Sequence, residues 1–294
     1  MTSPLATREL GRTRGPVLVL LHANGDSAAS WPDAARRWGD DYRVVAVDAR
    51  GHGASPWFSP DQLEEPGDVF IVDAIELLEE IAADGGPVIG IGHSLGAGTL
   101  TGVLAARPGL LTGAVLVDPP WDTPLVHGPR PGVGAGWVEA VREYQRDPER
   151  ALRDHAVDHP CWPADERAGW LEAKQSVDLD YLATGSGRPG TPWPRLVRDI
   201  ADATLVVTGE RDCLVGEATR AGPSWTRSPT RPSRSSSSPG PATTCGRTRP
   251  TRSTRWSTPG WPSASTGAEA TDTPGVTPSP APPPTQPRRA RTGP

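Results

Sequence analysis

The residues best suited to chemistry in this chain are Gly92-His93-Ser94-Leu95-Gly96, a Gly-x-Ser-x-Gly run. Val88–Ile91 before it has the composition of a buried strand, and Ala97–Ala106 after it has that of a helix. A tight strand-to-helix turn strains the serine backbone and exposes its hydroxyl, and glycines flank it because side chains there would collide with neighbouring elements. The sequence therefore predicts that Ser94 is a catalytic nucleophile; the alternative is a glycine-rich turn without chemistry.

The first residue of the predicted helix, Leu95, follows the serine directly. Amides at a helix N-terminus have no partner within the helix, and the helix dipole is positive there. We therefore expect the Leu95 backbone N–H to stabilise an oxyanion that forms next to Ser94.

Strands and helices alternate around this turn. Such alternation predicts an α/β fold, a doubly wound and mostly parallel sheet with helices on both faces. The expected strands are residues 17–21, 43–47, 87–91, 113–117 and 203–207, and the expected helices are residues 27–38, 68–83 and 95–106.

A long insertion interrupts the alternation between the last two expected strands. It contains helical pieces over residues 137–145 and 165–175 and five tryptophans, so it is interpreted as a helical cap. The predicted division is the first part of the core at 1–120, the cap at 121–195, the rest of the core with an acid-bearing strand and turn at 196–216, and a disordered low-complexity tail at 217–294.

Residues 10–215 resemble the α/β-hydrolase family. The run Leu20–Gly25, followed by Trp31, resembles the family's His-Gly oxyanion loop, with Ala23 where glycine is usual. The resemblance implies that the backbone N–H of Asn24 is the second oxyanion donor. The run Asp48–Ser55 resembles the family's Asp-x-Arg-Gly-His-Gly-x-Ser turn, which is usually structural. The histidines of these two runs, His22 and His52, are therefore interpreted as holding loops and not as catalytic bases.

The resemblance also implies a carboxylate that orients a catalytic histidine. Asp212, in the Gly-x-x-Asp turn after the last expected strand, occupies the family position; Asp118, after the preceding strand, is the alternative. With serine as nucleophile, the implied reaction is hydrolysis of an ester, thioester or lactone through an acyl-enzyme. The cap histidines and Cys161 lack the spacing of a metal site, and we expect no metal and no cofactor.

The histidine of the triad should follow Asp212, but the last histidine is His159. After Gly216 the chain contains no Leu, Ile, Phe, Met or Tyr, and its only Val is Val276. A segment of this composition cannot build a core. The last strand and helix of the fold are therefore expected to be missing, and the chain as written is expected to be impaired. The alternative function is a non-catalytic small-molecule binding protein of the same fold.

We hypothesise that the reading frame changes near Ala218–Pro223. Read one frame over, with G or C at third positions, Ser235–Cys245 can encode Val-Val-Val-Pro-Gly-Ala-Gly-His-Asp-Val, a buried strand followed by a Gly-His turn. Thr251–Pro262 can likewise encode an amphipathic helix. Strand, histidine turn and helix thus occur in the family's order. The alternative is an evolved disordered tail.

Composition narrows the partners and the location. Three scattered cysteines give no disulfide framework and are compatible with a reducing cytoplasm, and no run is long enough to span a membrane. The tail is basic but has neither interleaved aromatics nor a nucleic-acid-binding motif. We expect a cytoplasmic protein whose partner is a small molecule with an acyl group, with no nucleic-acid or membrane partner. The sequence leaves the oligomeric state open.

Overall fold

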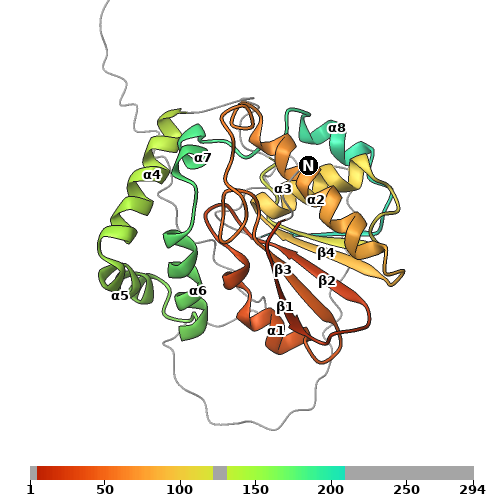
Figure 1. Cartoon of the computed structure of the whole chain (residues 1–294), viewed down its shortest axis with the longest axis horizontal. Helices are drawn as coiled ribbons and strands as arrows, with labels where there is room; N and C mark the ends of the chain where they lie inside the picture. The colour runs from red at the N-terminus through yellow and green to blue at the C-terminus, as the bar shows by residue number, and fades with distance from the viewer. Residues whose placement is uncertain (1–4, 122–130, 209–294) are drawn as a thin grey trace, which may run out of the picture. The chain divides into compact units, whose positions relative to one another are not determined.

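A computed structural model describes residues 5–121 and 131–208 (Figure 1). The turn containing Asp212, the predicted tail at 217–294 and the segment whose reading frame is in question lie outside the described residues.

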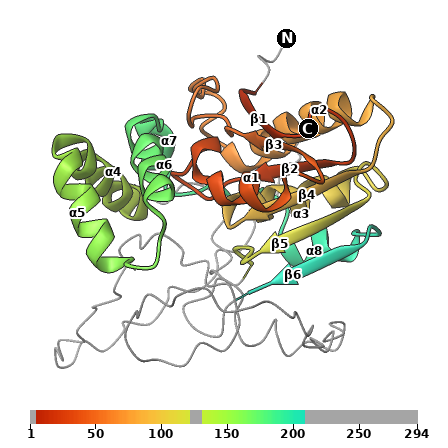
Figure 2. The same cartoon turned by 90° about the horizontal axis from the view of Figure 1, so that it is seen from below.

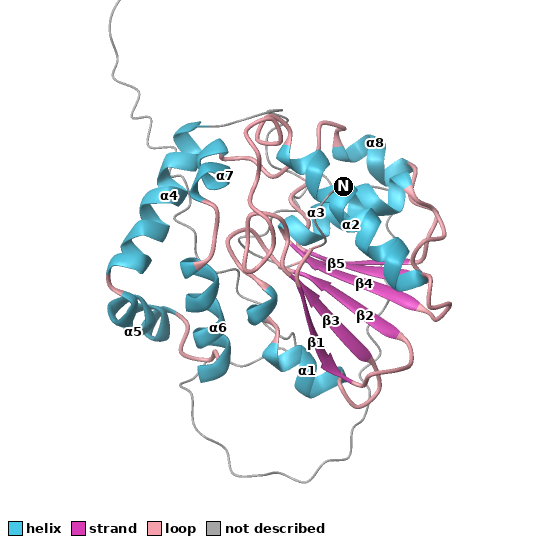
Figure 3. Ribbon diagram, in the orientation of Figure 1, coloured by secondary structure: helices cyan, strands magenta, loops and turns pink. Residues whose placement is uncertain are grey.

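Six strands form one sheet in the order β1-β3-β2-β4-β5-β6. Figure 3 shows β1 to β5 in this order, and Figure 2 labels β6 as well. Strand β1 pairs with β3 in antiparallel register and all the other pairs are parallel, so the mostly parallel sheet is confirmed. Because β2 and β4 are neighbours in the middle, the loops at their carboxyl ends meet at one edge of the sheet. The strands are β1 (Thr7–Gly11), β2 (Val17–Leu21), β3 (Arg43–Val47), β4 (Val88–His93), β5 (Gly113–Val117) and β6 (Thr204–Val207).

The sheet carries an apolar layer on each face, as expected for a doubly wound fold. One layer joins alternate residues of β2, such as Val19, to helices α2 (Pro66–Ala82), α3 (Leu95–Ala106) and α8 (Trp193–Arg198). The other joins the intervening residues of β2, such as Leu20, to the short helix η1 (Ala28–Ser30) and to α1 (Pro32–Trp38). Alternation of side chains along a strand produces these two layers.

Four helices between β5 and β6 lie together beside the sheet, as Figures 1 and 2 show. They are α4 (Pro131–Arg146), α5 (Pro148–Asp158), α6 (Ala164–Gln175) and α7 (Leu179–Thr184), and they are called the cap helices below. They pack on one another, and α6 also contacts η1 and α1. Helix α8 begins within the residues expected for the cap but packs against α3. The exact extent of the cap stays a prediction.

Candidate active site

Ser94 lies between β4 and α3 with φ 47° and ψ −106°, a conformation that non-glycine residues rarely adopt. Its own amide donates to the carbonyl of Val117 at 2.9 Å, and its carbonyl accepts from the Gly98 N–H at 2.9 Å. These bonds fix the strained turn between strand and helix. The side chain is partly exposed, and among the described residues its hydroxyl has no hydrogen-bond partner.

The two glycines of the motif are required by close approach of backbone to backbone. A Cβ at Gly92 would overlap the carbonyl oxygen of Gly96, and a Cβ at Gly96 would overlap the carbonyl oxygen of Leu21. The Gly96 amide also donates to the His22 carbonyl at 3.1 Å. The start of α3 is therefore pressed directly against the loop that follows β2, as the flanking glycines predict.

The backbone N–H groups of Asn24, in the loop after β2, and of Leu95, next to Ser94, have no acceptor within the described part of the chain. The neighbouring Gly25 and Asp26 amides are both bonded. Unbonded N–H groups on a rigid loop and at a helix N-terminus are the parts that an oxyanion site needs. Both amides are free to donate within the described residues, and their role as oxyanion donors stays a prediction.

His22 and His52 hold the loops at this edge of the sheet. The Nδ1 of His22 lies 2.7 Å from the Ala23 carbonyl, and its Nε2 accepts from the Ala49 N–H at 3.0 Å. His52 likewise accepts from the Gly25 N–H at 3.1 Å, and its Nδ1 lies 2.9 Å from the Arg50 carbonyl. Both ring nitrogens are thus occupied in the neutral Nδ1–H tautomer, and burial lowers the pKa of both rings. Neither side chain has a nitrogen available to take a proton, which agrees with the predicted loop-holding role.

The turn Asp48–Ser55 has the expected structural function. The Asp48 carboxylate accepts from the amides of Ala28 and Ala54, at 2.7 and 3.0 Å. Within the same turn, Arg50 forms a buried two-point ion pair with Asp73 of α2, at 2.7 and 2.9 Å, which raises the pKa of the guanidinium. These bonds tie the turn to both layers of the fold.

Of the two candidate acids, the structure describes Asp118 and not Asp212. Asp118 follows β5, is buried, and has φ 46°, the second non-glycine residue with positive φ among those described. Its amide donates to the Val207 carbonyl at 2.7 Å, and its carboxylate accepts from the Thr208 hydroxyl at 2.9 Å. Asp212 lies outside the described residues, so the choice between the two stays open.

Two cap residues that the sequence did not single out for this site contact the loop after β2. The ammonium of Lys174 bonds Gly25 and Asp26, and the hydroxyl of Tyr181 bonds Asn24. The one available signal was that Lys174 is the only lysine in the chain.

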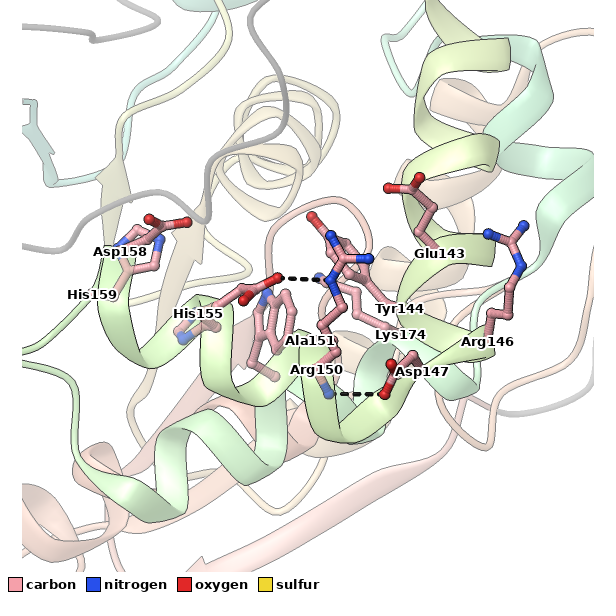
Figure 4. A pocket seen from close by; sticks show the side chains of 12 residues that line it. Glu143, Tyr144, Arg146, Asp147, Arg150, Ala151, His155, Asp158, His159 and Lys174 are labelled. Atoms are coloured by element: carbon pink, nitrogen blue, oxygen red, sulfur yellow. Dashed lines mark hydrogen bonds and ion pairs between the residues drawn. The ribbon is translucent and has the colours of Figure 1, made fainter.

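A cavity of about 410 Å³ lies among α4, α5 and α6 (Figure 4). Acidic and basic side chains surround it, and its aromatic part consists of Tyr144, His155, His159 and Trp170. Neither ring nitrogen of the buried His155 has a hydrogen-bond partner within the described ranges. Burial lowers the pKa of His155 to about 4, helped by the positive charges of His159 and Lys174. One lining residue, Lys174, also contacts the loop after β2, and Ser94 is not part of the lining.

Within the residues that the structure describes, no group of three or more His, Cys, Asp or Glu side chains is arranged to hold a metal ion. In that same part of the chain, every helix is too short or too polar to cross a membrane.

The fold and the motif define a hydrolase class, and the model of the alpha/beta hydrolase family matches residues 18–239. The chain belongs to this family. Lipase LipV of Mycobacterium tuberculosis is 30% identical over 221 residues, covering 72% of this chain and 77% of that protein. The 2-(acetamidomethylene)succinate hydrolase of Mesorhizobium japonicum is 29% identical over 229 residues, covering 74% and 78%. The crystal structure of E-2-(acetamidomethylene)succinate hydrolase superimposes with a TM-score of 0.54 at 23% identity, covering 74% and 81%, and shows the fold alone.

Proposed function

We propose that this protein is a serine hydrolase that cleaves an ester, thioester or lactone bond of a small acyl substrate through an acyl-enzyme. The observation that carries the proposal is the strained Ser94 beside two unbonded backbone amides, those of Asn24 and Leu95. Strain of this kind is retained where the surrounding structure enforces it, most often at functional sites. Relatives named as a lipase and as succinate-derivative hydrolases support hydrolysis of small substrates.

In the proposed reaction the Ser94 oxygen attacks the acyl carbon and the carbonyl oxygen becomes negative between the two amides. Removing one such donor in a serine hydrolase costs about 100- to 1000-fold in kcat. The leaving group departs with a proton, and water then releases the acyl group. Removing the proton from the Ser94 hydroxyl and delivering it to the leaving group both require a base within hydrogen-bond reach.

The base is what this chain lacks as written, because no histidine follows Asp212. His22 and His52 are committed to backbone groups. We propose Asp212 as the orienting acid, Asp118 as its alternative, and a histidine restored by the shifted reading frame as the base. The chain as written then retains an oxyanion site and a serine but turns over slowly or not at all.

The test compares the chain as written, a frame-restored chain and Ser94→Ala in each background. The probes are a fluorophosphonate that labels activated serines and a panel of p-nitrophenyl esters, thioesters and lactones. We expect labelling and turnover in the restored chain, at least 100-fold less in the chain as written, and none with Ser94→Ala. A restored chain that folds but is neither labelled at position 94 nor active on the panel would overturn the proposal.

The missing histidine also favours a second candidate, a binding protein that keeps the pocket without catalysis. Native mass spectrometry separates the two. A small acyl compound that binds the properly terminated chain and is recovered intact supports the binding protein, whereas recovery of its hydrolysed product supports the enzyme. Sequencing the DNA around codons 216–225 decides which C-terminus is native.

A further inference from the structure

The loop that carries Asn24 is held from two sides. From the sheet side, the Gly25 amide donates to His52, and within the loop the Asp26 amide donates to the Ala23 carbonyl at 3.0 Å. From the other side, the contacts come from the cap helices, about 150 residues further along the chain. The position of the proposed oxyanion donor therefore depends on a part of the protein that is distant in sequence.

Lys174, near the end of α6, makes the first cap contact. Its side chain is buried, and its ammonium donates to the Gly25 carbonyl at 2.5 Å and to the Asp26 carboxylate at 3.0 Å. The same nitrogen lies 5.5 Å from the centre of the Trp170 ring. Burying an ammonium is costly unless its partners are well placed, so the contact fixes the partners as firmly as it fixes the lysine.

Tyr181 of α7 makes the second contact, to Asn24 itself. Its hydroxyl donates to the Asn24 side-chain oxygen at 3.0 Å. The ring is buried, stacks on Phe58 with 5.1 Å between centres, and meets His52 edge-on at 5.4 Å. Burial raises the pKa of this hydroxyl, so it stays protonated and able to donate. Packing holds the Tyr181 ring in place, and its hydroxyl holds the Asn24 side chain by a hydrogen bond.

We propose that Lys174 and Tyr181 are positioning residues of the oxyanion site, through which the cap helices hold the Asn24 backbone N–H in place. The catalytic effect of this positioning rests on the function proposed above. A donor that binds only the developing oxyanion acts on the transition state, so a loosened loop lowers kcat and leaves KM nearly unchanged. If a substrate displaced the cap helices, Lys174 and Tyr181 would move the loop that carries Asn24.

The first experiment does not depend on activity. In the full chain, Lys174→Met and Tyr181→Phe are compared with the unmodified protein by amide hydrogen exchange. We expect exchange at Gly25 and Asp26 to quicken at least 10-fold in both variants, while α3 exchanges at an unchanged rate. Val141→Ala is the matched control, because Val141 is buried in the same apolar cluster as Tyr181 and has no polar group to bond the loop.

Unchanged exchange at Gly25 and Asp26 in both variants, or an equal change in Val141→Ala, overturns the proposal. Since Lys174→Met can prevent folding, Tyr181→Phe, which removes a single hydroxyl, decides the question alone in that case. The second experiment measures hydrolysis of an activated ester by the same variants in the restored frame. We expect about 10-fold lower kcat with KM within twofold, and the normal kcat for Val141→Ala. If the parent protein has no activity, the proposed function fails while the exchange data still decide whether the cap holds the loop.

Discussion

Backbone atoms lie so close to the turn of Ser94 that one added methyl group would overlap them. The carbonyl oxygen of Gly96 occupies the space where Gly92 would carry a side chain, and that of Leu21 does the same at Gly96. The elbow therefore depends on the absence of two methyl groups as much as on the presence of the serine.

Gly96→Ala is expected to destabilise the protein by about 1–3 kcal/mol, the usual cost of overpacking, because its Cβ would overlap the Leu21 carbonyl. Gly98→Ala is the control in the same helix: its Cβ would lie 3.4 Å from Pro120, an ordinary contact. Urea denaturation followed by tryptophan fluorescence gives both values. Equal stability of the two variants would contradict the close approach.

The Arg50–Asp73 pair gives a second prediction for single residues. Asp73→Ala leaves a buried guanidinium without its partner, which costs about 3–5 kcal/mol. Glu79→Ala breaks the exposed pair with Arg107 and should cost less than about 1 kcal/mol. The measurement is the free energy of unfolding in urea. A small effect of Asp73→Ala would mean that water reaches Arg50.

The site residues that could be predicted from the sequence lie in local motifs, whereas those that could not are joined by contacts between distant parts of the chain. Ser94, Leu95 and Asn24 lie in short motifs whose local geometry follows from their glycines and neighbouring strands. The Lys174–Asp26 contact joins residues 148 positions apart, and no local pattern encodes it. The same holds for Tyr181 and Asn24, which are 157 positions apart.

Among the elements, the buried strands were the most predictable. The expected ranges 17–21, 43–47 and 113–117 match β2, β3 and β5, because continuous apolar runs identify strands that are covered on both faces. Strand β1 was missed because its residues are mostly exposed and polar, and its pairing with β3 defines it. Helix α5 was missed because it buries only Ala151 and His155, too few residues to form an apolar stripe.

The packing of α5 on α6 predicts an acid-sensitive step in stability. The folded pKa of His155, about 4, lies below its ordinary value of 6.5, so the unfolded chain binds the proton more readily. The stability that the neutral ring provides is complete above about pH 6.5 and is lost as the pH falls from 6.5 towards 4. The groups facing the ring that set this window are His159, Lys174, Arg167 and Asp158.

Urea unfolding at pH 7.5 and at pH 5 measures this dependence. His155→Gln should lose less stability than the parent between the two values, since it cannot take up the proton. Tyr144→Phe, in the wall of the same cavity and without a group that titrates in this range, should keep the parent's dependence. Identical pH dependence of His155→Gln and the parent would show that the ring is hydrated. His22 and His52 remain in all three proteins and contribute a common background in the same direction.

For the molecule as a whole, the unusual feature is β6. It is one of the two outermost strands of the described sheet, opposite β1, and its side chains alternate between two environments. Val206 packs on the large apolar layer, whereas Leu205 and Val207, on the opposite face, are 54% and 41% exposed. An outermost strand with apolar residues open to water is an aggregation site unless another element covers it. In the α/β-hydrolase order, a further strand and helix follow here.

Restoring the reading frame near Ala218–Pro223 is expected to cover this face. Each large apolar side chain that becomes fully buried contributes about 1.5–3 kcal/mol, so covering Leu205 and Val207 should raise the free energy of unfolding by several kcal/mol and suppress aggregation. Urea unfolding and analytical ultracentrifugation would compare the chain as written, the restored chain, and a chain cut after Val215. The cut chain separates the loss of the tail from the gain of new structure, and it should resemble the chain as written. Leu205→Thr should reduce aggregation of the chain as written but destabilise the restored chain, because only there does the leucine have something to pack against. A restored chain no more stable than the cut one would refute the proposed frame change.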